Sequence, residues 1–317
     1  MGNYLTLLGT IAPVFLLLGI GFSIRRLKWL APEADQSLLN VVIKILYPCL
    51  ILNAVLDNPA MEQAGNLLVA PVLGVATVLI GFALAALALP LMRFNLSSQA
   101  RTFVFAIGIF NYGYLPIPLV EQLYDRETLG VLLLFNVGVE AAFWTVGIVV
   151  LTGISLRKGW KQILNPPAIS LALALFLNFT GLAAVLPGML LTTIALLGAC
   201  AIPLGLLLIG ATLGDFSTMI KDSGRIQWRV PFAASALRLG LIPLAFLALA
   251  YCLPTTPELK RVLVIQAAMP AAIFPIVIAR HYGGHPATAL SVVLATTCLS
   301  LLLIPLWLNL GSLWIDL

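Results

Sequence analysis

Apolar runs of about twenty residues follow one another along this sequence, and they limit what the chain can fold into. At 1.5 Å per residue, about 20 residues cross the roughly 30 Å hydrocarbon core of a bilayer as an α-helix. Runs of about ten residues with alternating polarity would instead indicate a membrane barrel. The sequence therefore predicts an all-α membrane protein with ten transmembrane helices. Their ranges are 4–25, 37–56, 67–92, 100–120, 128–153, 165–186, 189–213, 230–252, 260–280 and 286–309.

Charged residues are too scarce to cover a water-facing surface. Only 9% of the residues are charged and 61% are hydrophobic, whereas a soluble domain carries roughly 25% charged residues. This composition excludes a cytosolic enzyme, a disordered chain and a nucleic-acid-binding protein. The sequence also holds no phosphate-binding loop, nucleophile elbow or His-Glu-x-x-His pattern. We therefore expect neither an enzyme nor a cofactor, and the lipid bilayer is the expected surrounding.

Cysteine and histidine show no metal-ligand spacing. Two histidines, His281 and His285, flank a Gly-Gly pair in a predicted loop without a nearby carboxylate, which makes a poor metal site. The four cysteines lie inside apolar runs, which predicts buried apolar side chains rather than disulfides or ligands. They are Cys49, Cys200, Cys252 and Cys298.

The basic residues predict the orientation in the membrane. Lys and Arg gather in loops on the cytoplasmic side of membrane proteins. The loops after odd-numbered spans hold twelve of the 17 basic residues, and the opposite loops hold three. We therefore expect a protein of the bacterial inner membrane with both termini outside the cytoplasm. The first apolar run should be kept as a membrane span and not cleaved as a signal peptide. The twelve are Arg25, Arg26, Lys28, Arg93, Arg101, Arg157, Lys158, Lys161, Lys221, Arg225, Arg229 and Arg280.

Two spans carry paired prolines near mid-membrane. Pro116 and Pro118 lie in the fourth span, and Pro270 and Pro275 lie in the ninth. Proline lacks an N–H and clashes with the preceding helical turn, so both spans should be interrupted. Pro118 and Pro275 are 157 residues apart, which indicates two five-span halves in opposite orientation, as in many secondary transporters. The predicted halves are residues 1–153 and 165–317, joined by a cytosolic linker over 154–164.

Interrupted helices predict where a solute binds. Freed backbone groups are tolerated inside a membrane where they face a cavity, and the N-terminal ends of half-helices attract anions. Asn111 before the first break and Gln266 before the second can bond a carboxylate, although either side chain can instead serve only the freed backbone. The predicted substrate-binding residues are Asn111, Pro116, Pro118, Gln266, Pro270 and Pro275.

Glu140 lies at the centre of the fifth span. A carboxylate there costs about 2.5–3.5 kcal/mol on insertion scales and usually lines a pathway. We expect Glu140 to carry a coupling proton or to help bind a coupling cation, with Asn136 one turn away. The alternative is a protonated carboxyl bonded to backbone. The repeat gives Glu140 a counterpart, Thr297 beside Thr296, although threonine in a span more often bonds its own helix.

Other residues inside spans have plainer interpretations. Lys44 and Arg238 lie a few turns from the cytosolic end, so their long stems can snorkel to the interface. The alternative is a counter-charge for the substrate or for Glu140. Gly205 and Gly210, with Gly214 one turn on, should allow close helix packing in the seventh span.

Several of these stretches resemble the auxin efflux carrier family, which includes the plant PIN proteins and bacterial malate or malonate carriers. The similarity covers nearly the whole chain and is most specific at residues 266–283, QAAMPAAIFPIVIARHYG. Further matching stretches are Asn165-Pro166-Pro167, Ala201–Leu204, Gly210–Leu213, and Asn111 with Pro118.

The resemblance implies a fold related to bile-acid and sodium–proton transporters. It also implies a scaffold of spans 1, 2, 6 and 7, a moving transport domain of spans 3–5 and 8–10, an elevator-like motion, a homodimer and transport of small organic anions. Glu140 stands where plant members have a substrate-site Gln. Plant members also have Gln-Gly at Ala271-Ala272, often Gly at Pro116, and a long insert after span five.

Proton coupling through Glu140 is the first expectation, sodium coupling the second and uncoupled flux the third. A channel or a membrane receptor is the alternative to a carrier.

Overall fold

The computed structural model describes residues 4–94, 97–153, 164–222 and 228–314, and these residues form helices joined by short connections. Seven helices among these described residues are long and apolar enough to cross a membrane. The prediction of a helical membrane protein is thereby confirmed. The predicted linker, apart from residue 164, and the basic residues Arg157, Lys158, Lys161 and Arg225 lie outside the described residues.

Four of the seven long helices are continuous, and three contain one π-helical turn each. π-Helical turns inside α-helices occur mostly at functional sites. The continuous helices are α1 (Tyr4–Arg26), α4 (Ala64–Met92), α10 (Gly188–Asp222) and α15 (Pro286–Trp314). The others are α2 (Pro32–Val41), η1 (Val42–Leu46) and α3 (Tyr47–Val55); α7 (Arg126–Ala142), η3 (Phe143–Gly147) and α8 (Ile148–Thr152); and α11 (Arg229–Ala236), η7 (Leu237–Leu241) and α12 (Ile242–Cys252).

The remaining three predicted spans are a short helix and two interrupted pairs. The short helix α9 (Pro166–Phe179) ends before Gly181, which adopts a positive φ of 72°. The interrupted pairs are α5 (Ser97–Gly108) with α6 (Pro116–Leu123), and α13 (Pro257–Ala267) with α14 (Phe274–His281). Two 3₁₀ turns, η2 (Pro59–Glu62) and η6 (Leu182–Val185), lie in connections.

Proline explains where the second half-helix of each pair begins. Pro116 is the first residue of α6, and Pro275 is the second residue of α14. The missing N–H of proline costs nothing in the first turn of a helix, and its fixed φ suits that turn. Each pair therefore restarts at its proline after a non-helical stretch, 109–115 in the first pair and 268–273 in the second.

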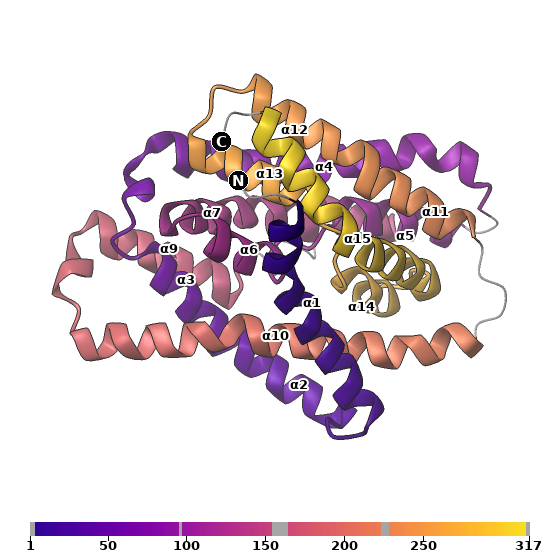
Figure 1. Cartoon of the computed structure of the whole chain (residues 1–317), viewed down its shortest axis with the longest axis horizontal. Coiled ribbons are helices and arrows are strands. Elements are labelled where there is room, and N and C mark those ends of the chain that lie inside the picture. Colours follow the sequence, from indigo (N-terminus) through magenta and orange to yellow (C-terminus); the bar gives the residue numbers. More distant parts are fainter. Residues whose placement is uncertain (1–3, 95–96, 154–163, 223–227, 315–317) are drawn as a thin grey trace.

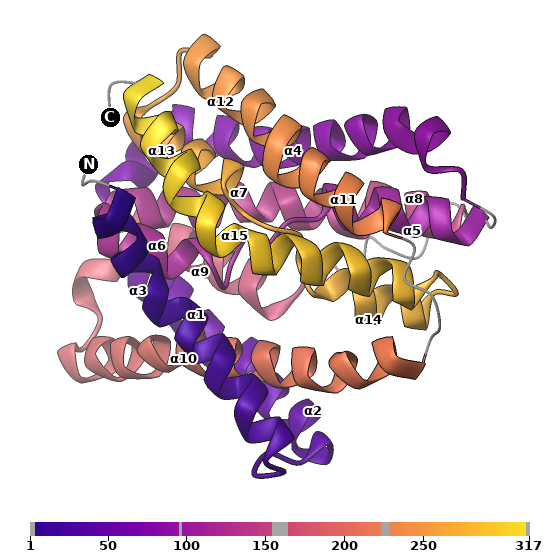
Figure 2. The ribbon, with the colours of Figure 1, turned by 45° about the vertical axis from the view of Figure 1, so that its right-hand side comes forward.

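The helices pack in two groups, which we call the α10 group and the α4 group. In the α10 group, α1 packs along α10, α10 packs on α3, and α3 packs on α9. In the α4 group, α4 packs on α7 and α5, and α13 packs on α7 and α12, while α15 packs on α11, α5 and α14. Figures 1 and 2 show α10 lying along one side of the molecule, with the α4 group on the other.

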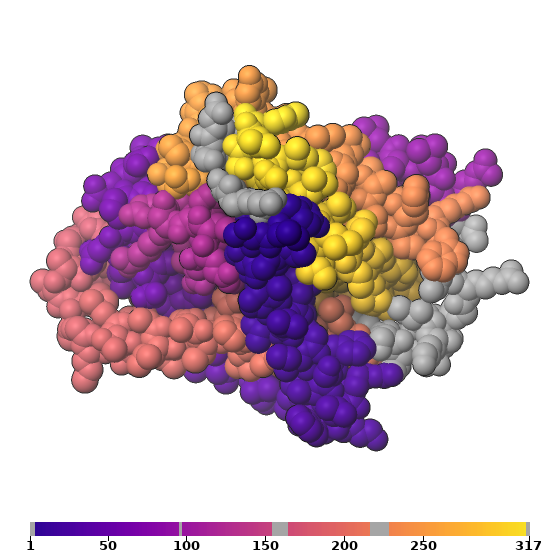
Figure 3. All heavy atoms as spheres, viewed as in Figure 1, coloured from indigo at the N-terminus to yellow at the C-terminus, as the bar shows by residue number. Residues whose placement is uncertain are grey.

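The two groups are joined where α1 also contacts α15. On the face shown in Figure 3, the spheres of α1 meet those of the C-terminal helix above and run down across α10. The start of α1 and the end of α15 lie near one another on the same side of the molecule (Figure 1).

The cysteine prediction is partly wrong. All four thiols are free, but Cys49 is half-buried and Cys200, Cys252 and Cys298 are exposed. A cysteine behaves as a small apolar side chain, so a helix face turned toward lipid accommodates it as readily as the protein interior does.

Gly210 allows α1 and α10 to approach closely, as the sequence predicts. A Cβ atom at Gly210 would overlap the carbonyl oxygen of Leu18 and lie 3.0 Å from the Phe22 nitrogen. Both neighbours are backbone atoms of α1 and cannot rotate away. The absence of a side chain at this position therefore sets the spacing of the two helices.

Replacing Gly210 with alanine should lower the Tm of the detergent-purified protein, because overpacking costs about 1–3 kcal/mol. Gly9→Ala is the matched control, since a Cβ there meets nothing within 4 Å and alanine is the better helix former. A Gly210→Ala protein as stable as Gly9→Ala would show that the two helices are not in the described contact.

Candidate functional site

The two interrupted helices meet at their breaks. Phe110 and Ala271 form an antiparallel bridge between the two non-helical stretches. The Asn111 N–H donates to the Pro270 carbonyl oxygen at 2.8 Å, and the Ala272 N–H donates to the Ile109 carbonyl oxygen at 3.0 Å. Unpaired backbone groups cost several kcal/mol each in hydrocarbon. We call the place where the two non-helical stretches meet the crossing. Its hydrogen bonds pair some of the backbone N–H and C=O groups that are left without helical partners at each break.

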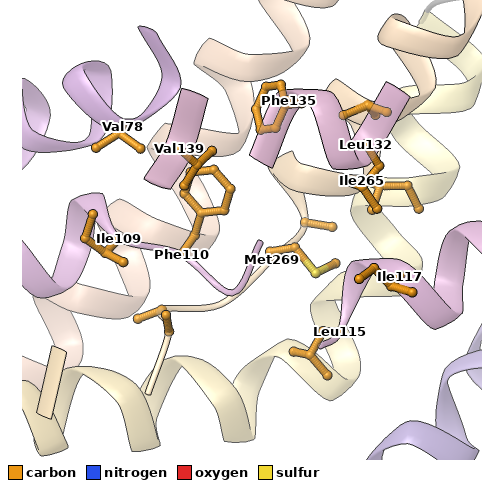
Figure 4. Close-up of a cluster of buried hydrophobic side chains, with 14 of the residues drawn as sticks. Val78, Ile109, Phe110, Leu115, Ile117, Leu132, Phe135, Val139, Ile265 and Met269 are labelled. Atoms are coloured by element: carbon orange, nitrogen blue, oxygen red, sulfur yellow. The ribbon is translucent and has the colours of Figure 1, made fainter. Parts of the chain in front are cut away.

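Apolar side chains surround this crossing. Phe110 from the first break and Met269 from the second lie in a buried cluster that the labelled side chains of α7 and α13 complete (Figure 4). Phe110 and Met269 are fully buried. Excluding lipid and water in this way strengthens the few hydrogen bonds that hold the crossing.

Side-chain amides and one hydroxyl complete the crossing. The Gln266 Nε2 donates to the Tyr112 carbonyl oxygen at 3.2 Å and to the Asn136 Oδ1 at 3.3 Å. The Asn111 Oδ1 accepts from the Leu115 N–H at 3.3 Å. The Thr296 hydroxyl accepts from the Ala271 N–H at 3.2 Å. The structure therefore brings Asn111, Asn136 and Gln266 to one place.

A cavity of about 450 Å³ lies beside the crossing. Its walls come from both helix groups, since residues of the α2–η1–α3 span, the start of α9 and α10 face residues of the crossing, α7, η3 and α14. Most of the lining is apolar or aromatic. The polar side chains that line it are those of Asp35, Asn111, Glu140, Asn165 and Thr212, together with the hydroxyl-bearing rings of Tyr47, Tyr112 and Tyr114.

Among the six predicted substrate-binding residues, Asn111 is the one on the described cavity lining. Gln266 is buried within the crossing, and Pro270 supplies the carbonyl that Asn111 bonds. The other three prolines lie buried in the first turns of the second half-helices: Pro116, Pro118 and Pro275. These prolines shape the crossing, and Asn111 faces the cavity.

Glu140 lines the cavity and is bonded by side chains. The Asn165 Nδ2 donates to its Oε2 at 2.5 Å, and the Tyr112 hydroxyl is a second hydrogen-bond partner. Asn165 also caps α9, because its Oδ1 accepts from the Ala168 N–H at 2.9 Å. One asparagine therefore begins a helix of the α10 group and bonds the carboxylate of the α4 group.

Of the neighbouring pair Thr296 and Thr297, the residue at the crossing is Thr296. Thr296 is buried and also donates to the Val292 carbonyl oxygen at 2.8 Å. Thr297 is half-buried, and its carbonyl accepts from the Ser300 hydroxyl. The described lining of the cavity does not include Thr297.

The prediction that Lys44 and Arg238 both snorkel to the interface fails for Arg238. Lys44 is exposed, as snorkelling requires, but Arg238 is 0% exposed. Its Nε donates to the Met269 carbonyl oxygen at 2.8 Å and its Nη2 donates to the Gln266 carbonyl oxygen at 3.0 Å. The snorkelling interpretation is wrong for Arg238, because its stem turns inward toward carbonyl groups at and just after the end of α13.

Gly205 also has a role beyond helix packing within the α10 group. A Cβ atom there would overlap the ring of Tyr114. Gly205 lines the cavity. Because it has no side chain, the non-helical stretch 109–115 can lie against α10.

Sequence reasoning missed Asn165 and the three tyrosines as site residues. Asn165 precedes two prolines, and an asparagine directly before proline at a helix start is a capping signal. Tyr112 and Tyr114 stand beside Asn111 in the predicted break. Only the second role of Asn165, its bond to Glu140, had no signal in the sequence.

Comparison with known proteins agrees with the architecture. The model of a family described as membrane transport protein matches residues 6–308 of this chain. The chain belongs to this family. The match confirms the resemblance to auxin efflux carriers, so the protein is an integral membrane transporter and not an enzyme.

Two archaeal relatives align along nearly their whole length. An uncharacterized transporter of Methanothermobacter thermautotrophicus is 25% identical over 305 residues, covering 94% of this chain and 96% of the relative. An uncharacterized transporter of Methanocaldococcus jannaschii is 26% identical over 302 residues, covering 93% and 95%. Neither name states a substrate.

Asn165→Asp should make the stability depend on pH. Aspartate caps a helix as asparagine does, but it places a second carboxylate beside Glu140, and two such carboxylates cannot both ionise cheaply. The Tm should therefore fall as pH rises from about 5 to 8. Asn165→Ser keeps a cap without adding charge and is the control. An equal response of both variants to pH would contradict the Asn165–Glu140 contact.

Proposed function

We propose that this protein is a secondary active transporter of small organic anions, chiefly carboxylates, and that the cavity beside the crossing is its substrate site. The observation that supports this most directly is the position of the cavity. It has walls from both helix groups and from both interrupted helices. A solute bound there contacts both helix groups, which would move relative to each other during transport.

Two half-helix N-termini favour a negative solute. Both α6 and α14 begin next to cavity-lining residues, Tyr114 and Phe274. The N-terminal end of a helix carries partial positive charge. The Asn111 carboxamide adds N–H donors, because its oxygen is already taken by Leu115. A carboxylate at this place would be held by dipoles and N–H groups.

The rest of the cavity favours an apolar body on the substrate. Phe110, Phe143, Trp144 and Ile209 line it together with the tyrosines. Binding sites for small molecules have volumes of roughly 300–1,000 Å³ and are mostly apolar with a few placed polar groups. A carboxylate attached to an apolar group therefore suits the cavity better than a solute that is polar along its whole length.

Glu140 supplies proton coupling in this proposal. The other carboxylate on the cavity, Asp35, forms an ion pair with Arg25, whereas the described partners of Glu140 are the neutral Asn165 and Tyr112. An ionised Glu140 repels a substrate carboxylate, and a protonated Glu140 donates a hydrogen bond to it. Proton and anion therefore bind together.

The packing supports a division into a scaffold and a transport domain. The α10 group contains predicted spans 1, 2, 6 and 7, and the α4 group contains spans 3–5 and 8–10. In an elevator-like motion the α4 group, carrying Asn111 and Glu140, slides along the α10 group. We further propose that ten segments span the membrane as two inverted repeats and that the protein works as a homodimer with both termini outside.

Polar contacts between the two groups must break during this motion. One is the Asn165–Glu140 bond described above. Another lies at the end of α3, where the Arg126 Nη2 of α7 donates to the carbonyl oxygens of Asn53 at 2.6 Å and Leu56 at 2.7 Å. A third joins α1 to α15, where the Tyr4 hydroxyl donates to the Leu302 carbonyl oxygen at 2.9 Å. These contacts are few and do not involve a buried ion pair, so breaking them is compatible with repeated cycling.

Glu140→Gln should abolish the response of transport to a pH gradient, because glutamine is isosteric but does not take up a proton. The measurement is uptake of a labelled carboxylate into proteoliposomes, with and without an inward proton gradient. Glu62→Gln, at an exposed glutamate of η2, is the control and should respond as the wild type does. Full proton dependence in Glu140→Gln would refute the coupling role.

Asn111→Asp should weaken binding of a carboxylate at least tenfold while leaving the protein folded. The aspartate still accepts from Leu115, but it removes the N–H donors and adds a repulsive charge. Ligands from a panel of carboxylic acids are found first by the rise in Tm that a ligand of the folded state produces. Wild-type affinity in Asn111→Asp would exclude Asn111 from the substrate site.

Counterflow in proteoliposomes separates a carrier from a channel or a receptor. A carrier preloaded with unlabelled substrate accumulates labelled substrate transiently, whereas neither a channel nor a receptor does so. Uptake that needs sodium at constant pH would replace protons with sodium as the coupling ion.

A further inference from the structure

Arg238 is the largest fully buried side chain in the described residues, and the proposed function leaves it without a role. It belongs to η7, the π-helical turn between α11 and α12. Its guanidinium carbon lies 4.6 Å from the ring centre of Phe110 and 5.3 Å from that of Phe246. Its remaining nitrogen, Nη1, has no hydrogen-bond partner among the described residues. The described ion pairs do not include Arg238.

An arginine without a carboxylate partner is costly inside a membrane, so its surroundings must compensate for the charge. The carbonyl groups of Gln266 and Met269 do this in part, since they lie at the C-terminal, negative end of the half-helix α13. The faces of the two phenylalanine rings add cation–π attraction. All of these contacts are made at the crossing.

Arg238 touches both interrupted helices. It donates to carbonyl groups of the second break, and it covers Phe110, which belongs to the first break and pairs with Ala271. A cation at this position holds the two breaks together. It lies behind the wall of the cavity, because the Phe110 ring that it contacts also lines the cavity. Elsewhere, sites built from free carbonyl groups at broken helices hold a coupling metal ion.

We infer that Arg238 is a resident cation that takes the place of a coupling metal ion at the crossing and fixes the charge of the transport site. The inference rests on the proposed function in one respect, the charge of the transported solute. Transport then needs no sodium. In the empty site the positive Arg238 balances an ionised Glu140. In the loaded site it balances the substrate anion, while Glu140 is protonated.

The other groups around Glu140 leave this charge count unchanged. Tyr47, Tyr112 and Tyr114 line the same cavity and are neutral near pH 7, and Asn165 is neutral. Asp35 belongs to the α10 group, where Arg25 balances it and also lies 3.3 Å from Asp215. One proton and one monoanion therefore move together without net charge, and the cycle is electroneutral.

The experiment compares the wild type with Arg238→Met, Arg238→Lys and Lys44→Met in proteoliposomes. Lys44→Met is the matched control, because it removes an exposed basic residue from a π-helical turn of another span. Uptake of a labelled carboxylate is driven by a pH gradient, at zero potential and at about 100 mV set with potassium and valinomycin. Sodium is either present or replaced by N-methyl-D-glucamine.

Wild type, Lys44→Met and Arg238→Lys should show uptake that changes less than twofold with potential or with sodium. Arg238→Met should lose most uptake, and its residual uptake should depend on potential, by up to about fifty-fold for one charge moved across 100 mV. A merely structural role for Arg238 would lower uptake without creating this dependence. Potential-dependent or sodium-dependent wild-type uptake would overturn the inference.

A second measurement works without a substrate and keeps the inference testable if Arg238→Met does not fold. The Tm of purified wild type and Arg238→Lys should be the same in sodium and in N-methyl-D-glucamine. A saturable rise of the wild-type Tm with sodium would show a bound metal ion and refute the inference. If the wild type takes up no carboxylate at all, the proposed function fails, while this sodium measurement still decides whether Arg238 replaces a metal ion.

Discussion

Backbone N–H and C=O groups need partners inside hydrocarbon, and the structure of this transporter is arranged around the two places where helical bonding stops. The breaks are placed against each other, so that Asn111 and Ala272 of the two stretches exchange bonds with Pro270 and Ile109. Gln266, Thr296 and Arg238 supply the bonds that the crossing does not. The cavity exists because this pairing leaves one side of the crossing open.

In our proposal, charge at the site is divided between Glu140, which takes up a proton, and Arg238, which does not. Glu140 lines the cavity, whereas Arg238 lies behind Phe110. Glu140 lies three residues before η3, and Arg238 lies within η7. π-Helical turns inside α-helices are frequent at functional sites.

The cavity also lies where the two helix groups face each other, which connects binding with movement. Asn165 shows this in a single side chain, since it caps α9 in one group and bonds Glu140 in the other. A solute or a proton that changes the charge of Glu140 therefore changes a bond between the groups. In the elevator-like motion that we propose, the occupancy of the site would therefore alter how easily one group slides past the other.

The sequence by itself determined that the chain is a helical membrane protein, where the two breaks lie, and that Asn111, Gln266 and Glu140 lie beside a break or inside a span. These follow from local rules, since apolar length, missing proline N–H groups and a carboxylate in a span act within a few residues of one helix. Only the tertiary structure decided that Asn165 bonds Glu140, that Thr296 serves the crossing, and that Arg238 turns inward. Each of these choices depends on a partner more than twenty residues away in the chain, and helical periodicity carries no information about which distant residue a side chain will meet.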